Sequence, residues 1–172
     1  MANYDSIQDL LKEHLNNEET PIAKQLMNQM NFAKGEGFFT MGFLYDIIDW
    51  KSPRSKSVWQ KNDNEYVKEV SQRFFLLTDD EDRMACLREL HGVAVPVASA
   101  ILTLMDPKNY GVIDFHVWQL LHQFGFVSEK EDGKNLSVSN WLQFLDILRL
   151  LAQQFEVSAR DVERTLFNYH RD

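Results

Sequence analysis

Apolar residues recur along this chain at intervals of three and four, the spacing that places side chains on one face of an α-helix. No alternating run is long enough to predict a strand, and no internal repeat is visible. We therefore predict an all-α fold. Helices are expected at about residues 4–16, 20–33, 40–50, 63–77, 78–90, 95–105, 115–124, 137–151 and 158–169.

Local signals mark where several of these helices begin and end. Thr20 and Pro21 supply an N-cap and a first-turn proline, and the run from Lys34 to Gly37 is expected to end the helix that they start. Two pairs have the spacing of a capping box, namely Thr78 with Glu81 and Ser158 with Asp161.

The four residues His91-Gly92-Val93-Ala94 stand between two apolar helical patterns. Four residues are too few for anything but a tight turn, so the sequence predicts a hairpin of two helices. Asp106-Pro107 then stops the second helix, and a loop leads to Asp114, which stands where the next helix begins. The hairpin and the helix that Asp114 opens span residues 80–124.

This segment resembles the helix-hairpin-helix superfamily of base-excision DNA glycosylases. The residues from Leu90 to Ala98, LHGVAVPVA, match the family's hairpin pattern L-x-G-V-G, and those from Ile113 to Val117, IDFHV, match its V-D-x-H-V element. The likeness covers about 35 residues and extends weakly back to Trp50-Lys51-Ser52-Pro53-Arg54. It implies a helix-hairpin-helix, DNA glycosylase-like helical domain.

Three positions depart from the family pattern. Ala94 replaces the second hairpin glycine and Val97 replaces a threonine. The Schiff-base lysine of lyase-competent members stands eighteen residues before the catalytic aspartate, and that position here is Pro96. The resemblance therefore implies a monofunctional enzyme that hydrolyses the N-glycosidic bond of a flipped nucleotide without β-elimination.

Asp114 matches the family's catalytic aspartate. Cleavage of an N-glycosidic bond builds positive charge on the sugar, and a nearby carboxylate stabilises that charge or assists an attacking water. An aspartate at this position is equally suited to cap the helix, and the two roles are compatible. His116 matches the histidine of the same element, and we expect it to line the base pocket or to pack against its neighbours.

Gly92, Val93 and Ala94 are expected to present backbone N–H groups at the start of a helix, which suits a DNA phosphate. The alternative is a plain corner between two helices. The resemblance also allows a monovalent cation at the hairpin carbonyls.

Lys51 and Arg54 belong to a segment, residues 51–61, that carries four cations and no acid. We expect these two side chains to contact DNA phosphates and Trp50 to stack on an extruded base. The alternative is a core tryptophan beside an ordinary solvated face. Lys51 is also a candidate replacement for the missing lysine nucleophile.

The chain's 172 residues are 44% hydrophobic and 12% aromatic, enough for one domain over residues 1–172. The net charge of −8 opposes DNA binding by the chain as a whole, so binding depends on a local basic face. The single cysteine, Cys86, excludes an intrachain disulfide and a four-cysteine iron–sulfur cluster. We expect a cytoplasmic protein with DNA as its partner, no membrane segment and no metal.

Two alternatives to a DNA glycosylase stay open. The first is a DNA-binding module that keeps the scaffold without catalysis, and the second is a helical protein-interaction module in which the hairpin is only a corner. The target base and any protein partner are not indicated by the sequence.

Overall fold

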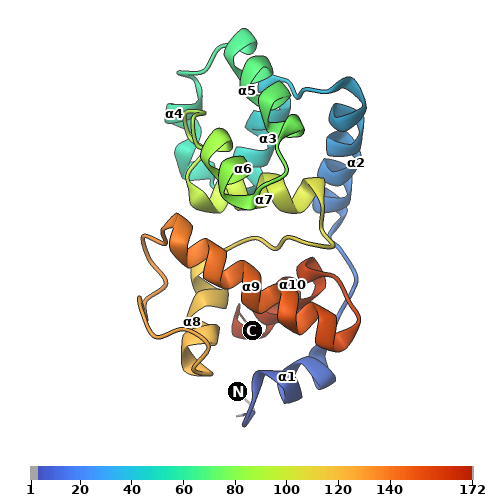
Figure 1. Cartoon of the computed structure of the whole chain (residues 1–172), viewed down its shortest axis with the longest axis vertical. Helices are drawn as coiled ribbons and strands as arrows, with labels where there is room; N and C mark the ends of the chain where they lie inside the picture. The colour runs from blue at the N-terminus through green and yellow to red at the C-terminus, as the bar shows by residue number, and fades with distance from the viewer. Residues whose placement is uncertain (1–3, 172) are drawn as a thin grey trace. The chain divides into compact units, whose positions relative to one another are not determined.

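The structure is a computed structural model that describes residues 4–171, together with all side chains in that range except those of residues 55, 56 and 171. This part of the chain forms ten α-helices and one short 3-10 helix, with no strand (Figure 1). The all-α prediction is confirmed. The elements are α1 (Ile7–His14), α2 (Pro21–Glu36), α3 (Met41–Lys51), η1 (Pro53–Ser55), α4 (Lys56–Trp59), α5 (Asn64–Leu76), α6 (Asp80–Leu87), α7 (Val95–Met105), α8 (Phe115–Gln123), α9 (Val138–Phe155) and α10 (Ala159–Arg171).

The helices group into two compact units. Unit 1 combines Met1–Glu18 with Asp106–Asp172 and holds α1, α8, α9 and α10. Unit 2 is Glu19–Met105 and holds η1 and α2 to α7. The expectation of a single domain over residues 1–172 stays a prediction.

Unit 2 is organised around α7, the second helix of the hairpin. All of its residues except Pro96 are buried, and it packs against α2, α3 and α6. A helix that is apolar on every side suits such a position, because each face removes hydrocarbon from water. The hairpin is thereby anchored at its C-terminal side in the core of unit 2.

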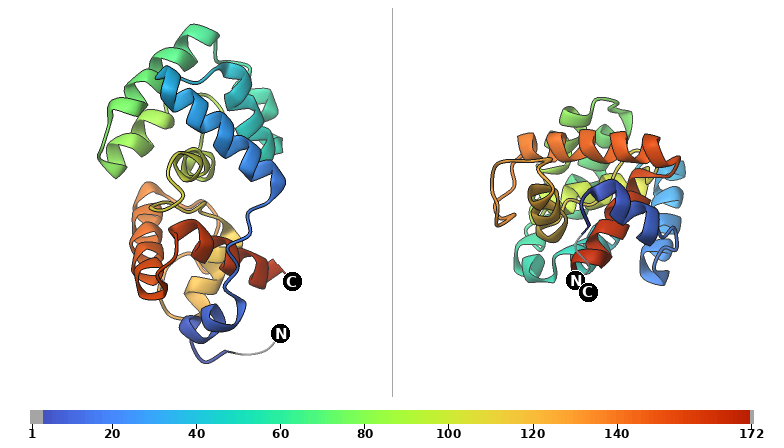
Figure 2. Two further views of the ribbon diagram at one scale, coloured as in Figure 1. Left: turned by 90° about the vertical axis from the view of Figure 1, so that its right-hand side faces the viewer. Right: turned by 90° about the horizontal axis from the view of Figure 1, so that it is seen from below.

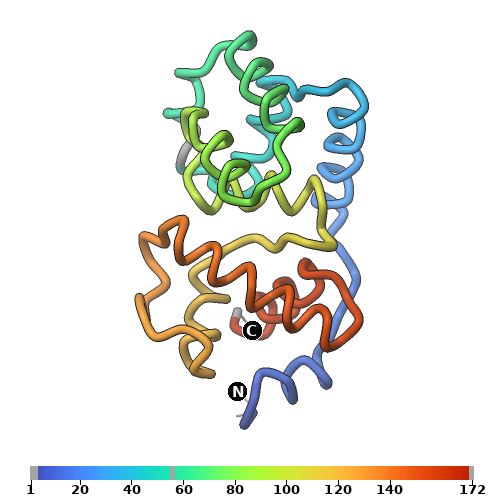
Figure 3. Tube along the Cα trace, in the orientation of Figure 1, coloured from blue at the N-terminus to red at the C-terminus, as the bar shows by residue number. Residues whose placement is uncertain are grey.

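Unit 1 is organised around α10, which contacts α1 and α8 and crosses α9 (Figure 2). The chain from Asp106 to Asp114 runs without helix (Figure 3). It is held by α10, whose N–H groups at Ala159 and Arg160 donate to the carbonyls of Lys108 and Pro107 at 3.0 and 3.1 Å. The loop that leads to Asp114 therefore satisfies first-turn donors of α10 that have no intrahelical partner.

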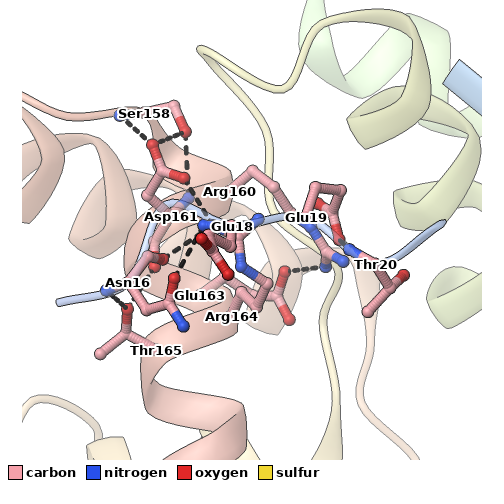
Figure 4. A network of polar contacts seen from close by, with 10 residues as sticks. All are labelled: Asn16, Glu18, Glu19, Thr20, Ser158, Arg160, Asp161, Glu163, Arg164 and Thr165. Carbon is pink, nitrogen blue, oxygen red and sulfur yellow. Dashed lines mark hydrogen bonds and ion pairs between the residues drawn. The ribbon is translucent and has the colours of Figure 1, made fainter. Parts of the chain in front are cut away.

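The start of α10 also takes part in a network of polar contacts (Figure 4). Asp161 N–H donates to Ser158 Oγ at 3.0 Å and Ser158 N–H donates to Asp161 Oδ2 at 3.2 Å, so the predicted capping box is confirmed. The buried Arg164 donates to Asp161 Oδ1 and to the carbonyl of Asn16, each at 2.7 Å. These bonds tie the segment after α1 to α10.

Some of the other predicted helix boundaries agree with the structure and some differ from it. Thr20 caps α2 as predicted, but α2 continues through residue 35 to Glu36 and ends at Gly37, whose φ of 78° needs a glycine. The cap of α6 is Asp79 rather than Thr78, because its carboxylate accepts from the N–H groups of both Glu81 and Asp82. The helices η1 and α4 are too short for their periodicity to be seen.

Gly111, in the loop before Asp114, offers a test of packing in unit 1. A Cβ at this position would overlap Leu148 Cδ1 of α9 and lie 2.9 Å from Glu163 Cβ of α10. We expect Gly111→Ala to lower the free energy of unfolding by about 1–3 kcal/mol in a denaturant titration. Gly35→Ala is the control, since a Cβ inside α2 meets no atom within 4 Å and should stabilise slightly. Equal effects of the two substitutions would contradict this packing.

Candidate functional site

The hairpin turn lies between the end of α6 at Leu87 and the start of α7 at Val95. Gly92 has a φ of +84°, and Val93 N–H donates to the carbonyl of Leu90 at 3.1 Å. A positive φ is energetically unfavourable for a residue that has a Cβ, whereas glycine adopts it without this cost. The glycine of the predicted hairpin is therefore required by the backbone of the turn.

Gly92 also lies against other backbone. A Cβ there would be 3.3 Å from the Trp59 nitrogen and 3.4 Å from Ile48 Cδ1. Trp59 belongs to α4 and Ile48 to α3, so the turn rests on the chain that leads through the basic segment of residues 51–61. The structure thus brings the hairpin and this segment together within unit 2.

Asn62 fixes the turn. This side chain, only 5% exposed, accepts from His91 N–H through Oδ1 and donates to the His91 carbonyl through Nδ2, both at 2.9 Å. Nδ2 also donates to the carbonyl of Trp59 at 2.8 Å. One amide therefore joins the turn to the end of α4. Sequence patterns did not indicate this role of Asn62, because a lone asparagine has no informative spacing.

The start of α7 presents backbone donors. The first-turn N–H groups of a helix have no partner within it, and Pro96 in this turn has no N–H to present. The exposed Ala94 adds a methyl group where the family pattern has glycine, and its carbonyl accepts from Ala98 N–H at 2.9 Å. The turn keeps the anion-attracting end of α7, with fewer donors than a proline-free helix.

Two carbonyls of the turn accept hydrogen bonds from the protein itself. The Leu90 oxygen accepts from Val93 N–H, and the His91 oxygen accepts from Asn62. A monovalent cation would need these oxygens as ligands in place of, or in addition to, their present donors. A monovalent cation at this turn stays a prediction.

The predicted basic residues lie at the end of α3 and just after it. Lys51 is the last residue of α3 and is half-buried, Trp50 before it is also half-buried, and Arg54 in η1 is exposed. Lys61 and the α6 C-cap Arg88 are exposed as well. The assignment of Trp50 to a base pocket and of Lys51 and Arg54 to phosphate binding stays a prediction.

One carboxylate close to the turn is neutralised. Glu89 accepts two hydrogen bonds from the Arg73 guanidinium, at 3.0 and 2.5 Å, and these bonds hold the pKa of Glu89 below its usual value. A paired carboxylate repels a phosphate less than a lone one does. The approach to the hairpin is therefore less acidic than the sequence around Glu89 suggests.

Asp114, in unit 1, is the N-cap of α8. Its Oδ1 accepts from His116 N–H at 2.9 Å, which is the capping role that the sequence allowed beside the catalytic one. The side chain is half-buried.

His116 packs with a second histidine that the sequence did not single out. The Nδ1 atoms of His116 and His170 are 3.0 Å apart, and the ring of Phe167 meets His116 edge-on. Burial and then the positive charge of His116 lower the pKa of His170, while Asp114 acts in the opposite direction. Asp114, His116 and His170 therefore form one electrostatic group, and the place of His116 in a base pocket stays a prediction.

Two further observations concern residues 4–171. No group of three or more His, Cys, Asp or Glu side chains in this part of the chain is arranged to hold a metal ion. No helix there combines the length and apolar composition needed to cross a bilayer.

No known protein family matches this chain, and no curated protein matches its sequence. Among solved structures, the chain is similar to the crystal structure of Methanocaldococcus jannaschii 8-oxoguanine glycosylase/lyase in complex with 15mer DNA containing 8-oxoguanine. The two chains are 14% identical, the comparison covers 95% of this chain and 88% of that one, and the TM-score is 0.48. Because the sequence identity and the TM-score are both low, we assign the site from this chain's own residues.

The hydrogen bonds between Asn62 and His91 yield a prediction about the turn. Asn62→Ala should lower the free energy of unfolding by about 1–3 kcal/mol, because it removes a buried amide and leaves the part-buried N–H and carbonyl of His91 without their partner. Amide hydrogen exchange at His91 should become faster. Asn31→Ala, on the exposed face of α2, is the matched control and should change little. An unchanged rate of amide hydrogen exchange at His91 in Asn62→Ala would show that Asn62 does not hold the turn.

The histidine pair yields a pH dependence. Because the pKa of folded His170 is lowered, the unfolded chain takes up a proton that the folded chain does not, so stability should fall as pH drops from about 7 to 5. His170→Gln should make the melting temperature less dependent on pH in that window. His91→Gln, at an exposed histidine, is the control and should keep the wild-type slope. A slope that is the same in both variants would rule out this role of His170.

Proposed function

We propose that this protein is a monofunctional DNA glycosylase, which hydrolyses the N-glycosidic bond of a flipped nucleotide. The observation that supports this most directly is the hairpin turn. Gly92 adopts a positive φ, a Cβ there would lie in tight contact with the Trp59 backbone, and Asn62 holds both backbone polar groups of His91. This fixed turn leads directly into the N-terminus of α7, where a DNA phosphate finds backbone donors and a favourable dipole.

The cations of unit 2 supply the remaining affinity for DNA. Lys51 and Arg54 belong to the chain that supports the turn, and the exposed Arg88 precedes it. Cationic groups bind DNA by displacing counterions, so a local cluster binds even on a chain with a net charge of −8. The acidic remainder of the protein then limits contact to one face.

Asp114 is the proposed catalytic carboxylate. The sugar gains positive charge as the base departs, and Asp114 stabilises this charge or orients the water that attacks the anomeric carbon. The bond between base and sugar breaks, the water oxygen bonds to the sugar, and its protons pass to the solvent and the departing base. His116 donates its backbone N–H to Asp114 and so fixes the orientation of the carboxylate.

The missing lysine defines the product. Pro96 has no amine and therefore forms no Schiff base, so the proposed reaction ends at an intact abasic site without β-elimination. Extrusion of a base costs a few kcal/mol, which favours a damaged or mispaired base as substrate.

A non-catalytic DNA-binding module is the second candidate. One observation favours it: Asp114 serves as the N-cap of α8, a structural role sufficient to explain an aspartate at this position. Ala94 and Pro96 also reduce the backbone donors near the turn. Such a module would bind DNA and release no base.

Base release separates the two candidates. Duplex and single-stranded oligonucleotides carrying a panel of lesions are incubated with the protein and treated with alkali, which cleaves at abasic sites. We expect wild type to produce scission at one class of lesion and Asp114→Asn to reduce the rate at least a hundredfold. Asparagine caps helices as well as aspartate does, so the fold should be kept. Asp63→Asn, at the N-cap of α5, is the matched control and should leave the rate unchanged.

A second experiment measures binding alone. The double variant Lys51→Glu/Arg54→Glu should weaken duplex binding at least tenfold and reduce the dependence of affinity on salt. Lys24→Glu/Lys108→Glu changes the net charge equally at exposed lysines outside the basic segment and should cost far less. Binding by wild type that the double variant weakens, without base release, would favour the non-catalytic module. No binding by wild type would reject both candidates.

A further inference from the structure

Unit 2 contains a pocket away from the hairpin, formed where the C-terminal half of α2 meets the start of α3. Its volume is about 610 Å³, within the usual range for sites that hold small organic molecules. Four phenylalanines and two carboxylates are its chemically distinctive lining residues: Phe32, Phe38, Phe39, Phe43, Glu36 and Asp46.

The phenylalanines give the pocket its apolar walls. Phe39 and Phe43 belong to the core and meet edge to face, with ring centroids 6.2 Å apart. Phe32, on α2, is 72% exposed. When an apolar group covers an aromatic ring that is this exposed to water, the free energy is lowered.

The charge of the pocket is negative. Glu36 and Asp46 are exposed at its rim, and among the described residues neither forms an ion pair or hydrogen bond. No lysine or arginine is among the residues that line the pocket. The two carboxylates at the rim therefore favour a cation over an anion.

Two details indicate the kind of cation. The Lys68 ammonium lies 4.8 Å from the centre of the Phe38 ring, so an aromatic face of this region already holds a cation from the protein itself. The side-chain oxygen of Gln29, another lining residue, is buried without a hydrogen-bond partner. A buried acceptor of this kind is stabilised by a donor that enters the pocket.

We propose that this pocket binds a small organic cation, an ammonium or guanidinium group carried on an aromatic or alkyl body. The body packs against Phe32, Phe39 and Phe43. The cationic group lies between Glu36 and Asp46 and donates an N–H to Gln29. This site is independent of the proposed glycosylase activity, because its lining residues belong neither to the hairpin nor to the Asp114 group.

The test uses three series of probes with matched shapes: arylalkylamines such as 2-phenylethylamine, the corresponding alcohols, and the corresponding carboxylates. Each series is titrated into the whole protein, and binding is followed through the backbone amide resonances of residues 32–46. We expect the amines to bind at least tenfold more tightly than the alcohols and the carboxylates not to bind. Equal binding of the three series, or no binding by any amine, would overturn the proposal.

Variants identify the residues responsible. Glu36→Gln/Asp46→Asn should reduce the preference for amine over alcohol to near unity, and Phe32→Ala should weaken both probes. All three positions are exposed, so the substitutions should leave the fold intact. Glu65→Gln/Asp146→Asn removes the same charge at exposed acids outside the pocket and should keep the wild-type preference. Loss of the preference in this control as well would attribute it to net charge and contradict the proposed site.

Discussion

The rest of unit 2 depends on how closely the hairpin turn approaches the chain between α3 and α5. Gly92 has a positive φ, and a Cβ there would be in tight contact with the Trp59 backbone. The Asn62 side chain joins the two segments through hydrogen bonds to the carbonyl of Trp59 and to both backbone polar groups of His91. Because Asn62 and the Trp59 backbone hold the turn, the start of α7 keeps a fixed direction. A rigid, preorganised turn suits phosphate binding, since little order has to be created on association.

Charge is distributed unevenly on this acidic chain. Arg73 neutralises Glu89 beside the turn, whereas Glu36 and Asp46 have no pairing partner among the described residues beside the aromatic pocket. The two proposals therefore assign opposite preferences to two parts of unit 2, one for phosphates and one for organic cations. Salt screens charges that are more than a Debye length apart. Beyond that separation, charge reversal in the basic segment should not alter cation binding in the aromatic pocket.

Much of the fold followed from local patterns. The caps at Thr20 and Ser158 and the glycine of the turn were predictable, since each is set by residues within one helical turn. Asn62 and His170 were not, because their partners lie 29 and 54 residues away in sequence. Neither a lone asparagine nor a histidine near the chain end has a periodicity that reveals a distant contact. The capping role of Asp114 was predicted, and its catalytic role remains a proposal.

The most direct test of this account is a titration of isotope-labelled protein with a short duplex, followed through the backbone amide resonances of the turn. If the turn grips DNA, the amides of Gly92, Val93, Ala94 and Val95 shift strongly at low salt and shift less as salt is added. Shifts of similar size spread over the acidic surface, or none at the turn, would contradict the assignment of this hairpin to phosphate binding.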